Sequence, residues 1–445
     1  MVVLRSIRRL VTVLLALLVA SSSAAASTPT PVTSLPARLS LEDALKIFRT
    51  HGLDLLLADA VVLSAQGDRV AAGAVPNPLL SVAGGTSFGY TPDVTNCPGC
   101  SAQNWNLALS DQNALFDTIS GKRGLRMRIA DAAIRATRMA RADAQRTLEY
   151  QLKQQYIQAV LARDQLDFAI EVQRSSTQTF ELNQVRYKAG AISEADVAKV
   201  EAAKLEADQG VATARQQLRV GKVALALLLG VRGSLPSFEV EPDLPKYVVP
   251  PQIASMTPEN LLKEALEHRP DLKAQLHQEE RAQWAVKAAK RLLVPDIALS
   301  VNFYGQGYGQ NAIQPPTLDF GIQLPLPLFY HYRGERLKAQ ADLDTQTVQV
   351  AKAQAQILAD VQTAYENITA SRELVERMEG RLLERARRAR DLIAIQYQKG
   401  AASLLEFLDA QRTYNATYQE YLQDLANYWT SFFLLEQALG SELQS

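Results

Sequence analysis

The stretch YKAGAISEAD at residues 187–196 returns in altered form as YQKGAASLLE at residues 397–406. Both copies hold a Tyr, then a Gly, a Ser and an acidic residue at successive steps of three, and the offset between the copies is 210. Residues 42–55 also match residues 259–272, at an offset of 217. Matches at a nearly constant offset predict two copies of one structural unit. We assign the copies to residues 27–240 and 241–445.

Each copy predicts a helix, two strands and a long helical hairpin, in that order. The first helix should cover about residues 41–74, and its counterpart about residues 258–293, because prolines end both patterns. The run from Gly121 to Lys188 contains no proline and would form a helix about 100 Å long. Six prolines within residues 231–258 indicate an irregular connector between the copies.

The strand segments alternate between an apolar and a polar face, most clearly in residues 104–109, 299–304 and 318–324. A soluble sheet with one buried face would show the same alternation. However, the polar face carries Gly, Ser, Asn and Gln rather than Lys and Glu, which suits a water-filled lumen. Four strands cannot close a barrel, and an open sheet edge cannot lie in lipid. A transmembrane interpretation therefore requires an oligomer.

The composition excludes several classes of protein. The 47 Lys and Arg balance the 47 Asp and Glu, which leaves no net positive charge to bind nucleic acid. Two cysteines and four scattered histidines offer no ligand set for a metal centre. The sequence also lacks a nucleophile-base arrangement and a phosphate-binding loop. We therefore expect neither an enzyme nor a cofactor.

The first residues predict a secretory signal peptide, residues 1–26. A start with three arginines precedes an apolar run at residues 10–20, and an Ala-x-Ala cleavage site ends at Ala26. A membrane anchor is the alternative, but the run of 11 apolar residues is too short to span a bilayer as a helix. The mature protein is therefore expected to be exported.

The last helix carries a coiled-coil pattern with alternating spacings of four and three. This seam consists of Leu404, Leu408, Gln411, Asn415, Tyr418, Leu422, Leu425, Trp429 and Phe432. A second line beside it consists of Phe407, Tyr414, Tyr421, Tyr428 and Leu435. A simple helix pair needs only one line, so we expect this helix to contact more than one partner and to help form the oligomer. A plain soluble helical bundle is the alternative architecture.

Together these features resemble the TolC-type outer-membrane efflux channels over essentially the whole mature chain. The resemblance rests on the repeat, on the two Tyr-x-x-Gly-x-x-Ser segments, and on QLPLPLF at residues 323–329. The last run is followed by Arg333-Gly334-Glu335. With Gly121-Lys122-Arg123 in the first copy, it looks like the CzcC-like branch that is linked to metal-cation efflux.

The resemblance implies an α+β membrane protein with two internal repeats per chain. Three chains would each donate four strands to a twelve-stranded transmembrane β-barrel in the outer membrane. A long α-helical coiled-coil barrel would continue it into the periplasm of a Gram-negative-type envelope.

The implied function is the passive exit duct of a tripartite efflux system. Its expected partners are a second and third copy of the chain, outer-membrane lipid, a periplasmic adaptor and an inner-membrane RND-type pump. Heavy-metal cations are the expected cargo, with drug or solvent efflux and type I secretion as alternatives. A structural coiled-coil protein of the envelope is the alternative from another class.

The two hairpin tips are the expected contact with the adaptor. The resemblance gives this role to Tyr187, Gly190, Ser193, Tyr397, Gly400 and Ser403. From the residues alone, each glycine would supply the positive φ of a tight reversal between helices, and turning the chain could be its whole role.

Glu406 and Asp409 lie just beyond the second tip. In the family that the chain resembles, two carboxylates three positions apart surround the periplasmic entrance, so three copies would place six there as a gate. A solvated helix face is the alternative. Ala402 departs from the family pattern, because a basic latch residue can occur at this position.

Cys97 and Cys100 form a Cys-Pro-Gly-Cys segment between the first two strands. In an oxidising compartment we expect a small loop disulfide. A thiol redox site would need a helix start in a βαβ context, and two ligands are too few for a closed zinc site. Metal capture at the channel exit is the alternative.

Overall fold

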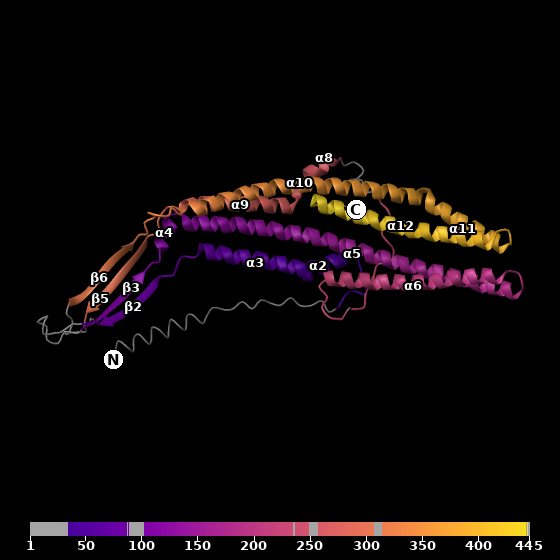
Figure 1. Ribbon diagram of the computed structural model, residues 1–445, viewed down its shortest axis with the longest axis horizontal. Coiled ribbons are helices and arrows are strands. Elements are labelled where there is room, and N and C mark those ends of the chain that lie inside the picture. Colours follow the sequence, from indigo (N-terminus) through magenta and orange to yellow (C-terminus); the bar gives the residue numbers. More distant parts are fainter. Residues whose placement is uncertain are drawn as a thin grey trace.

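The computed structural model of the protein describes residues 34–86, 88, 102–234, 236–248, 257–306, 314–441 and 443. The expected signal peptide and the Cys97–Cys100 segment lie outside the described residues. The molecule is elongated, with a sheet at one end and the tips of two helical hairpins at the other (Figure 1).

The helices run along the length of the molecule (Figure 1). The first half contains α2 (Leu41–His51), α3 (Leu53–Gly73), α4 (Ala114–Ile119), α5 (Lys122–Lys188) and α6 (Glu194–Leu228). The second half contains α8 (Pro258–His268), α9 (Pro270–Arg291), α10 (Arg333–Arg377), α11 (Leu383–Gln398) and α12 (Leu404–Leu439), with the π-helical turn η2 (Met378–Leu382) between α10 and α11. The 67 residues of α5 confirm the long proline-free helix.

The helices expected at residues 41–74 and 258–293 are each broken into two, so this prediction was wrong in both copies. Gly52 separates α2 from α3 with an extended ψ of 119°. Arg269 separates α8 from α9 with a ψ of 123°, because a residue that precedes proline avoids the helical region. Arg269 is only 3 % exposed, and its guanidinium pairs with Asp271 at 2.6 Å and with Asp360 at 2.7 Å. These ion pairs fix the second break against α10.

One antiparallel sheet holds four strands in the order β2 (Leu79–Thr86), β3 (Gln103–Ser110), β5 (Ala298–Gln306) and β6 (Gln314–Gln323). The register aligns apolar side chains across all of them, for example Val82, Leu107, Phe303 and Leu318 in one row. The next row on the other face consists of Ser81, Ala108, Asn302 and Asp319. The alternation read from the sequence is therefore the real pattern of the sheet. Within the described residues, β2 and β6 have no strand on their outer sides.

The connector between the halves packs on the helical body. It contributes β4 (Glu239–Val240), which pairs in parallel with β1 (Arg38–Leu39). Phe238 and Leu244 of this connector are buried in the main hydrophobic core. The indole Nε1 of Trp429 donates to the carbonyl oxygen of Pro245 at 2.8 Å, which ties the connector to α12.

The seam on α12 is largely filled by its own chain. Leu422, Leu425, Trp429 and Phe432 are all buried in the main core, together with residues of α5 and α10. Our expectation that this part of the seam faces other copies was therefore wrong. The heptad pattern was real, but most of its partners come from the same chain.

Candidate functional site at the hairpin tips

The two tips have nearly the same backbone. After α5, Gly190 adopts a φ of 72°, and the amide of Ala191 donates to the carbonyl oxygen of Arg186 at 2.9 Å. After α11, Gly400 adopts a φ of 77°, and the amide of Ala401 donates to the carbonyl oxygen of Gln396 at 2.8 Å. This six-residue hydrogen bond around a left-handed glycine is the Schellman motif. The conformational role expected for both glycines is confirmed.

A serine caps the helix that leaves each tip. Ser193 caps α6, and its hydroxyl accepts from the amide of Asp196 at 3.2 Å. Ser403 caps α12 in a full capping box, in which the Glu406 carboxylate accepts from the Ser403 amide at 2.7 Å. These hydrogen bonds satisfy helix N-terminal amides that would otherwise lack partners. Both serines therefore have a structural role whether or not a partner also contacts them.

Tyr187 and Tyr397 hold equal positions in the two tips but have different surroundings. Tyr187 is 43 % exposed, whereas Tyr397 is 7 % exposed. The Tyr397 hydroxyl donates to Oδ1 of Asn183 at 2.5 Å, and its ring stacks on Phe407 with centroids 5.0 Å apart. The guanidinium of Arg186 lies 5.0 Å above the same ring. Tyr397 thus joins the second hairpin to the first, and Tyr187 is free to meet a partner.

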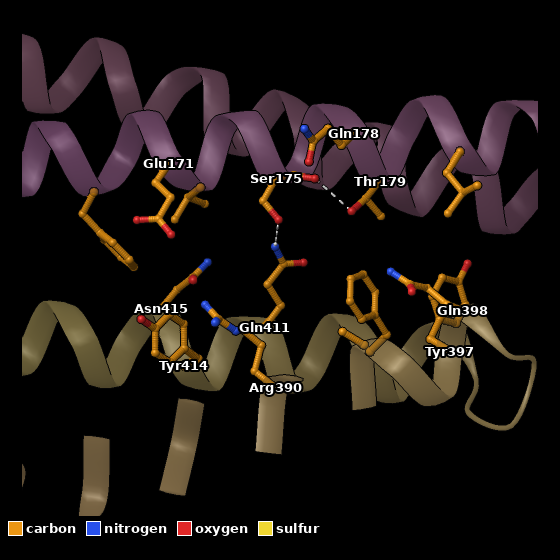
Figure 2. Close-up of a pocket in the computed structure, with 15 residues that line it drawn as sticks. Glu171, Ser175, Gln178, Thr179, Arg390, Tyr397, Gln398, Gln411, Tyr414 and Asn415 are labelled. Atoms are coloured by element: carbon orange, nitrogen blue, oxygen red, sulfur yellow. Dashed lines mark hydrogen bonds between the residues drawn. The ribbon is translucent and has the colours of Figure 1, made fainter. Parts of the chain in front are cut away.

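A groove of about 260 Å³ lies between α5 on one side and α11 and α12 on the other (Figure 2). Its walls are mostly polar, with Ser175, Gln178, Gln398, Gln411 and Asn415 among the lining residues. Gln411 donates to the Ser175 hydroxyl at 3.1 Å across the groove, which Figure 2 shows. The two hairpins are therefore held near their tips by polar contacts together with aromatic packing, in which Phe168 of α5 lies against Tyr414 and Tyr418 of α12.

The two predicted gate residues are both exposed on the first turns of α12. The pKa of Glu406 lies below its ordinary value, first because its carboxylate accepts from the Ser403 amide and second because it accepts from the Ser403 hydroxyl. Glu406 is therefore held by the cap, and Asp409 projects from the next turn. The single chain brings them to the same end of the molecule as the tips.

Sequence reasoning missed Asn183 and the contact between Ser175 and Gln411. Asn183 is fully buried in α5, four residues before Tyr187. A polar amide in the last turns of a long helix was the only signal available. Gln411 gave a stronger one, because it occupies a seam position where an apolar residue is expected.

None of the helices built from the described residues is both long enough and apolar enough to cross a membrane. The same residues contain no group of three or more His, Cys, Asp or Glu side chains arranged to hold a metal ion.

Comparison with known proteins gives a consistent result. The family model for "Outer membrane efflux protein" matches residues 48–231 and 261–441. The pyoverdine export outer membrane protein OpmQ of Pseudomonas aeruginosa is 27% identical over 419 residues, which cover 91% of this chain and 86% of OpmQ. The cobalt-zinc-cadmium resistance protein CzcC of Cupriavidus metallidurans is 22% identical over 403 residues, 90% of each chain.

The fold is also that of a solved channel. The CmeC outer membrane channel of Campylobacter jejuni superposes with a TM-score of 0.74 at 16% identity, over 90% of this chain and 85% of CmeC. The family model, matched twice, covers most of the chain. The chain therefore belongs to the outer membrane efflux protein family, the TolC-type channels of the Gram-negative outer membrane.

Proposed function

We propose that the chain is the passive exit duct of a tripartite efflux system, and that three copies close a twelve-stranded barrel. The observation that carries this proposal is the sheet, in which one apolar face runs across four strands and both edge strands are unpaired in the described chain. In lipid, an unsatisfied backbone group costs several kcal/mol. Pairing β2 of one copy with β6 of the next removes every open edge.

The two-copy organisation, with units at residues 27–240 and 241–445, remains part of the proposal. Its support is that each half runs from a broken helix through two strands to a long hairpin with a glycine tip. The two breaks, at Gly52 and Arg269, are 217 residues apart, which is the offset seen in the sequence.

The exposed tips would receive the periplasmic adaptor, which in turn connects the duct to an inner-membrane RND-type pump. Tyr187, Gly190, Ser193, Gly400 and Ser403 are exposed at this end and open to a partner. Tyr397 would act indirectly, because it holds the second tip in place from inside the chain.

The tips can be tested through their glycines, because a Cβ at Gly190 or Gly400 would meet no atom within 4 Å. Replacing Gly400 by Val should strain the positive φ by about 1–2 kcal/mol. This cost is too small to unfold the hairpin, but it displaces the turn. We expect export to fall while the protein stays in the membrane, whereas Gly67→Val on exposed α3, also without a neighbour within 4 Å, should export normally. Normal export by the Gly400 variant would remove the tips from the proposed docking site.

Glu406 and Asp409 would form the entrance gate. Six carboxylates around a threefold axis would repel one another and attract cations to a narrow opening. The hydrogen bonds from Tyr397 to Asn183 and from Gln411 to Ser175 would hold the hairpins in the closed arrangement.

Heavy-metal cations are the first candidate cargo, because the chain is 22% identical to a cobalt-zinc-cadmium resistance protein and its Arg333-Gly334-Glu335 and Gly121-Lys122-Arg123 segments resemble the CzcC-like branch. A small organic molecule is the second candidate, because a pyoverdine export protein shares 27% identity.

Deleting the chain in the cell that makes it tests both the duct and its cargo. Retained cobalt, zinc and cadmium would be measured by mass spectrometry of washed cells, and siderophore would be measured in the medium. We expect the deletion strain to retain the metals and to recover when the wild-type chain is restored. Normal metals with siderophore trapped in the periplasm would select the second candidate. No change in either would contradict the efflux function.

A further inference from the structure

Two motifs singled out in the sequence lie at the boundary between the sheet and the helices. Gly121-Lys122-Arg123 begins α5, and Arg333-Gly334-Glu335 begins α10. With the last turn of α9, these helix ends carry a group of cations that we call the basic collar. It consists of Lys122, Arg123, Arg126, Lys290, Arg291, Arg333 and Arg336.

The carboxylates next to the collar neutralise only part of it. Lys122 pairs with Asp296 at 2.7 Å, and Arg126 pairs with Asp117 at 2.7 Å. Asp111 is committed to backbone amides, among them that of Leu299 at 2.8 Å. Glu335 accepts from the Tyr330 hydroxyl at 2.5 Å.

The remaining collar cations form no ion pair with a carboxylate of the described residues. Arg123 donates to the backbone oxygen of Gly73 at 2.8 Å. Lys290, Arg291 and Arg333 are exposed and make no ion pair in this part of the structure. Each copy therefore presents an excess of positive charge at this level, although the whole chain has a formal net charge of zero.

Helix stability accounts for Lys290 and Arg291, which lie in the last turn of α9, but not for the cations that begin α5 and α10. The positive end of the helix dipole disfavours a cation in the first turn. Helices α6 and α12, which start at the tips, follow this rule with a serine cap and acidic residues in their first turns. Helices α5 and α10, which start beside the sheet, have no side-chain cap and carry cations in that turn. The first turn of α5 has no acidic residue, and that of α10 has Glu335 next to its cations. The helices that start at the tips and the helices that start beside the sheet therefore differ in their surroundings.

The collar adjoins surface that is apolar and exposed. Phe329 is 99 % exposed, and Leu326 and Leu328 beside it are also exposed, just ahead of Arg333. The apolar face of the sheet begins next to the collar, where Leu80 and Phe320 are exposed. Aromatic and aliphatic residues followed by Arg and Lys are typical of the boundary between hydrocarbon and phospholipid headgroups.

We propose that the basic collar binds the phosphate groups of anionic phospholipids in the periplasmic leaflet of the outer membrane. This inference rests on insertion of the sheet into that membrane, which is part of the proposed function. The collar would fix the depth at which the barrel ends and the helical body begins, because charge attraction falls off within about 10 Å.

The test uses the full-length protein, purified in mild detergent and incorporated into lipid nanodiscs. The lipids are phosphatidylcholine and phosphatidylglycerol in equal amounts, and native mass spectrometry counts the lipids that remain bound after release. The collar variant carries Lys290→Gln, Arg291→Gln and Arg333→Gln. The matched control carries Arg215→Gln, Arg219→Gln and Arg388→Gln, which removes the same charge from exposed helix positions far from the sheet.

We expect the wild type and the control to retain phosphatidylglycerol in preference to phosphatidylcholine. Each cation at an anionic membrane surface contributes about fivefold in affinity. The collar variant lacks three cations, so its preference for phosphatidylglycerol over phosphatidylcholine should be weaker than that of the wild type by on the order of a hundredfold. Raising the salt concentration should weaken the preference of the wild type for phosphatidylglycerol and should have little effect on the collar variant.

Three results would overturn the proposal. An unchanged lipid preference in the collar variant would show that the cations do not select lipid. Displacement of phosphatidylglycerol by an equal concentration of inorganic phosphate would show a site for the free anion. Dissociation of the variant into single chains would show that the collar is a contact between copies. If the wild type does not enter the nanodiscs, the membrane insertion fails, and this outcome is distinct from insertion without lipid preference.

Discussion

At the scale of single residues, the two tip tyrosines provide a matched pair. Removing the Tyr397 hydroxyl leaves Oδ1 of the fully buried Asn183 without its donor. An unsatisfied buried polar group costs about 1–3 kcal/mol. We therefore expect Tyr397→Phe to shift the equilibrium between docked and released hairpins by about 5- to 150-fold. In planar bilayers, the variant should open more often than the wild type.

Tyr187→Phe is the control, because it removes the same hydroxyl from an exposed position in the first tip, where this hydroxyl has no hydrogen-bond partner among the described residues. Its single-channel record should match that of the wild type. Equal behaviour of the two variants would mean that the buried hydrogen bond does not hold the closed arrangement.

Glu406 and Asp409 can be separated because only Glu406 belongs to the cap. The pKa of Glu406 is lowered in the folded protein, chiefly by the hydrogen bond from the Ser403 amide. A carboxyl with a lowered folded pKa stabilises the protein above its unfolded pKa, and this contribution is lost as the pH falls through the folded value. The cap is therefore intact at neutral pH and opens only in acid.

For the gate, we expect Glu406→Gln with Asp409→Asn to weaken cation selectivity and block by divalent cations. Asp409→Asn alone should produce much of this effect, because its carboxylate is not committed to a cap. Single-channel current with and without millimolar divalent cation measures both properties. Glu384→Gln on exposed α11 is the control. If selectivity and block are the same in all four proteins, both residues belong to an ordinary solvated helix face.

At the scale of elements, the heptad pattern of α12 is compatible with packing inside one chain and with packing between copies. Trp429 is buried in the core of its own chain and donates to Pro245. We expect Trp429→Ala to lower the free energy of unfolding by about 3–5 kcal/mol. Leu405→Ala, at an exposed position of the same helix, should change it little. Denaturant unfolding followed by circular dichroism makes the comparison. A Trp429 variant that loses its oligomer but keeps its unfolding midpoint would return this residue to an interface between copies.

Much of the element structure could be predicted from the sequence. The long run without proline predicted helix α5, and the alternation of apolar and polar residues predicted three of the strands. The break at Arg269 could have been predicted, because Pro270 follows it inside the helical pattern. The break at Gly52 had only a single glycine as its signal. The heptad spacing in α12 predicted the correct lines of apolar residues. It could not predict which chain covers them, because the spacing is the same for contacts within one chain and for contacts between copies.

The candidate site was predicted in part for a related reason. The turns at Gly190 and Gly400 could be predicted from the local sequence, because a backbone reversal depends only on neighbouring residues. The contact between Tyr397 and Asn183 joins residues 214 apart in the chain. Neither residue carries a local sign of the other, so only the packing of the two hairpins reveals it.

At the scale of the whole molecule, the account rests on the open edges of the sheet. A chain of the outer membrane efflux family with four strands, an apolar face and two unpaired edges in its described part can satisfy its backbone in lipid only by pairing with other copies. Closure also predicts a limit, because a ring ends when its last edge meets its first. An open sheet has no such limit and would continue to grow.

The most direct test is therefore a crosslink between the two edge strands of different copies. Ser81 on β2 is replaced by Cys together with one residue at a time on the same face of β6, namely Thr317, Asp319 or Gln323, because barrel closure staggers the strands that meet between copies. Cys97 and Cys100 are changed to Ser. The outer membranes are treated with a short bismaleimide and run on a denaturing gel. The account predicts a ladder of one, two and three chains that ends at three, with single-cysteine variants giving no covalent trimer. A ladder that continues past three, or a series in which every double-cysteine protein stays a single chain, would contradict the closed trimeric barrel.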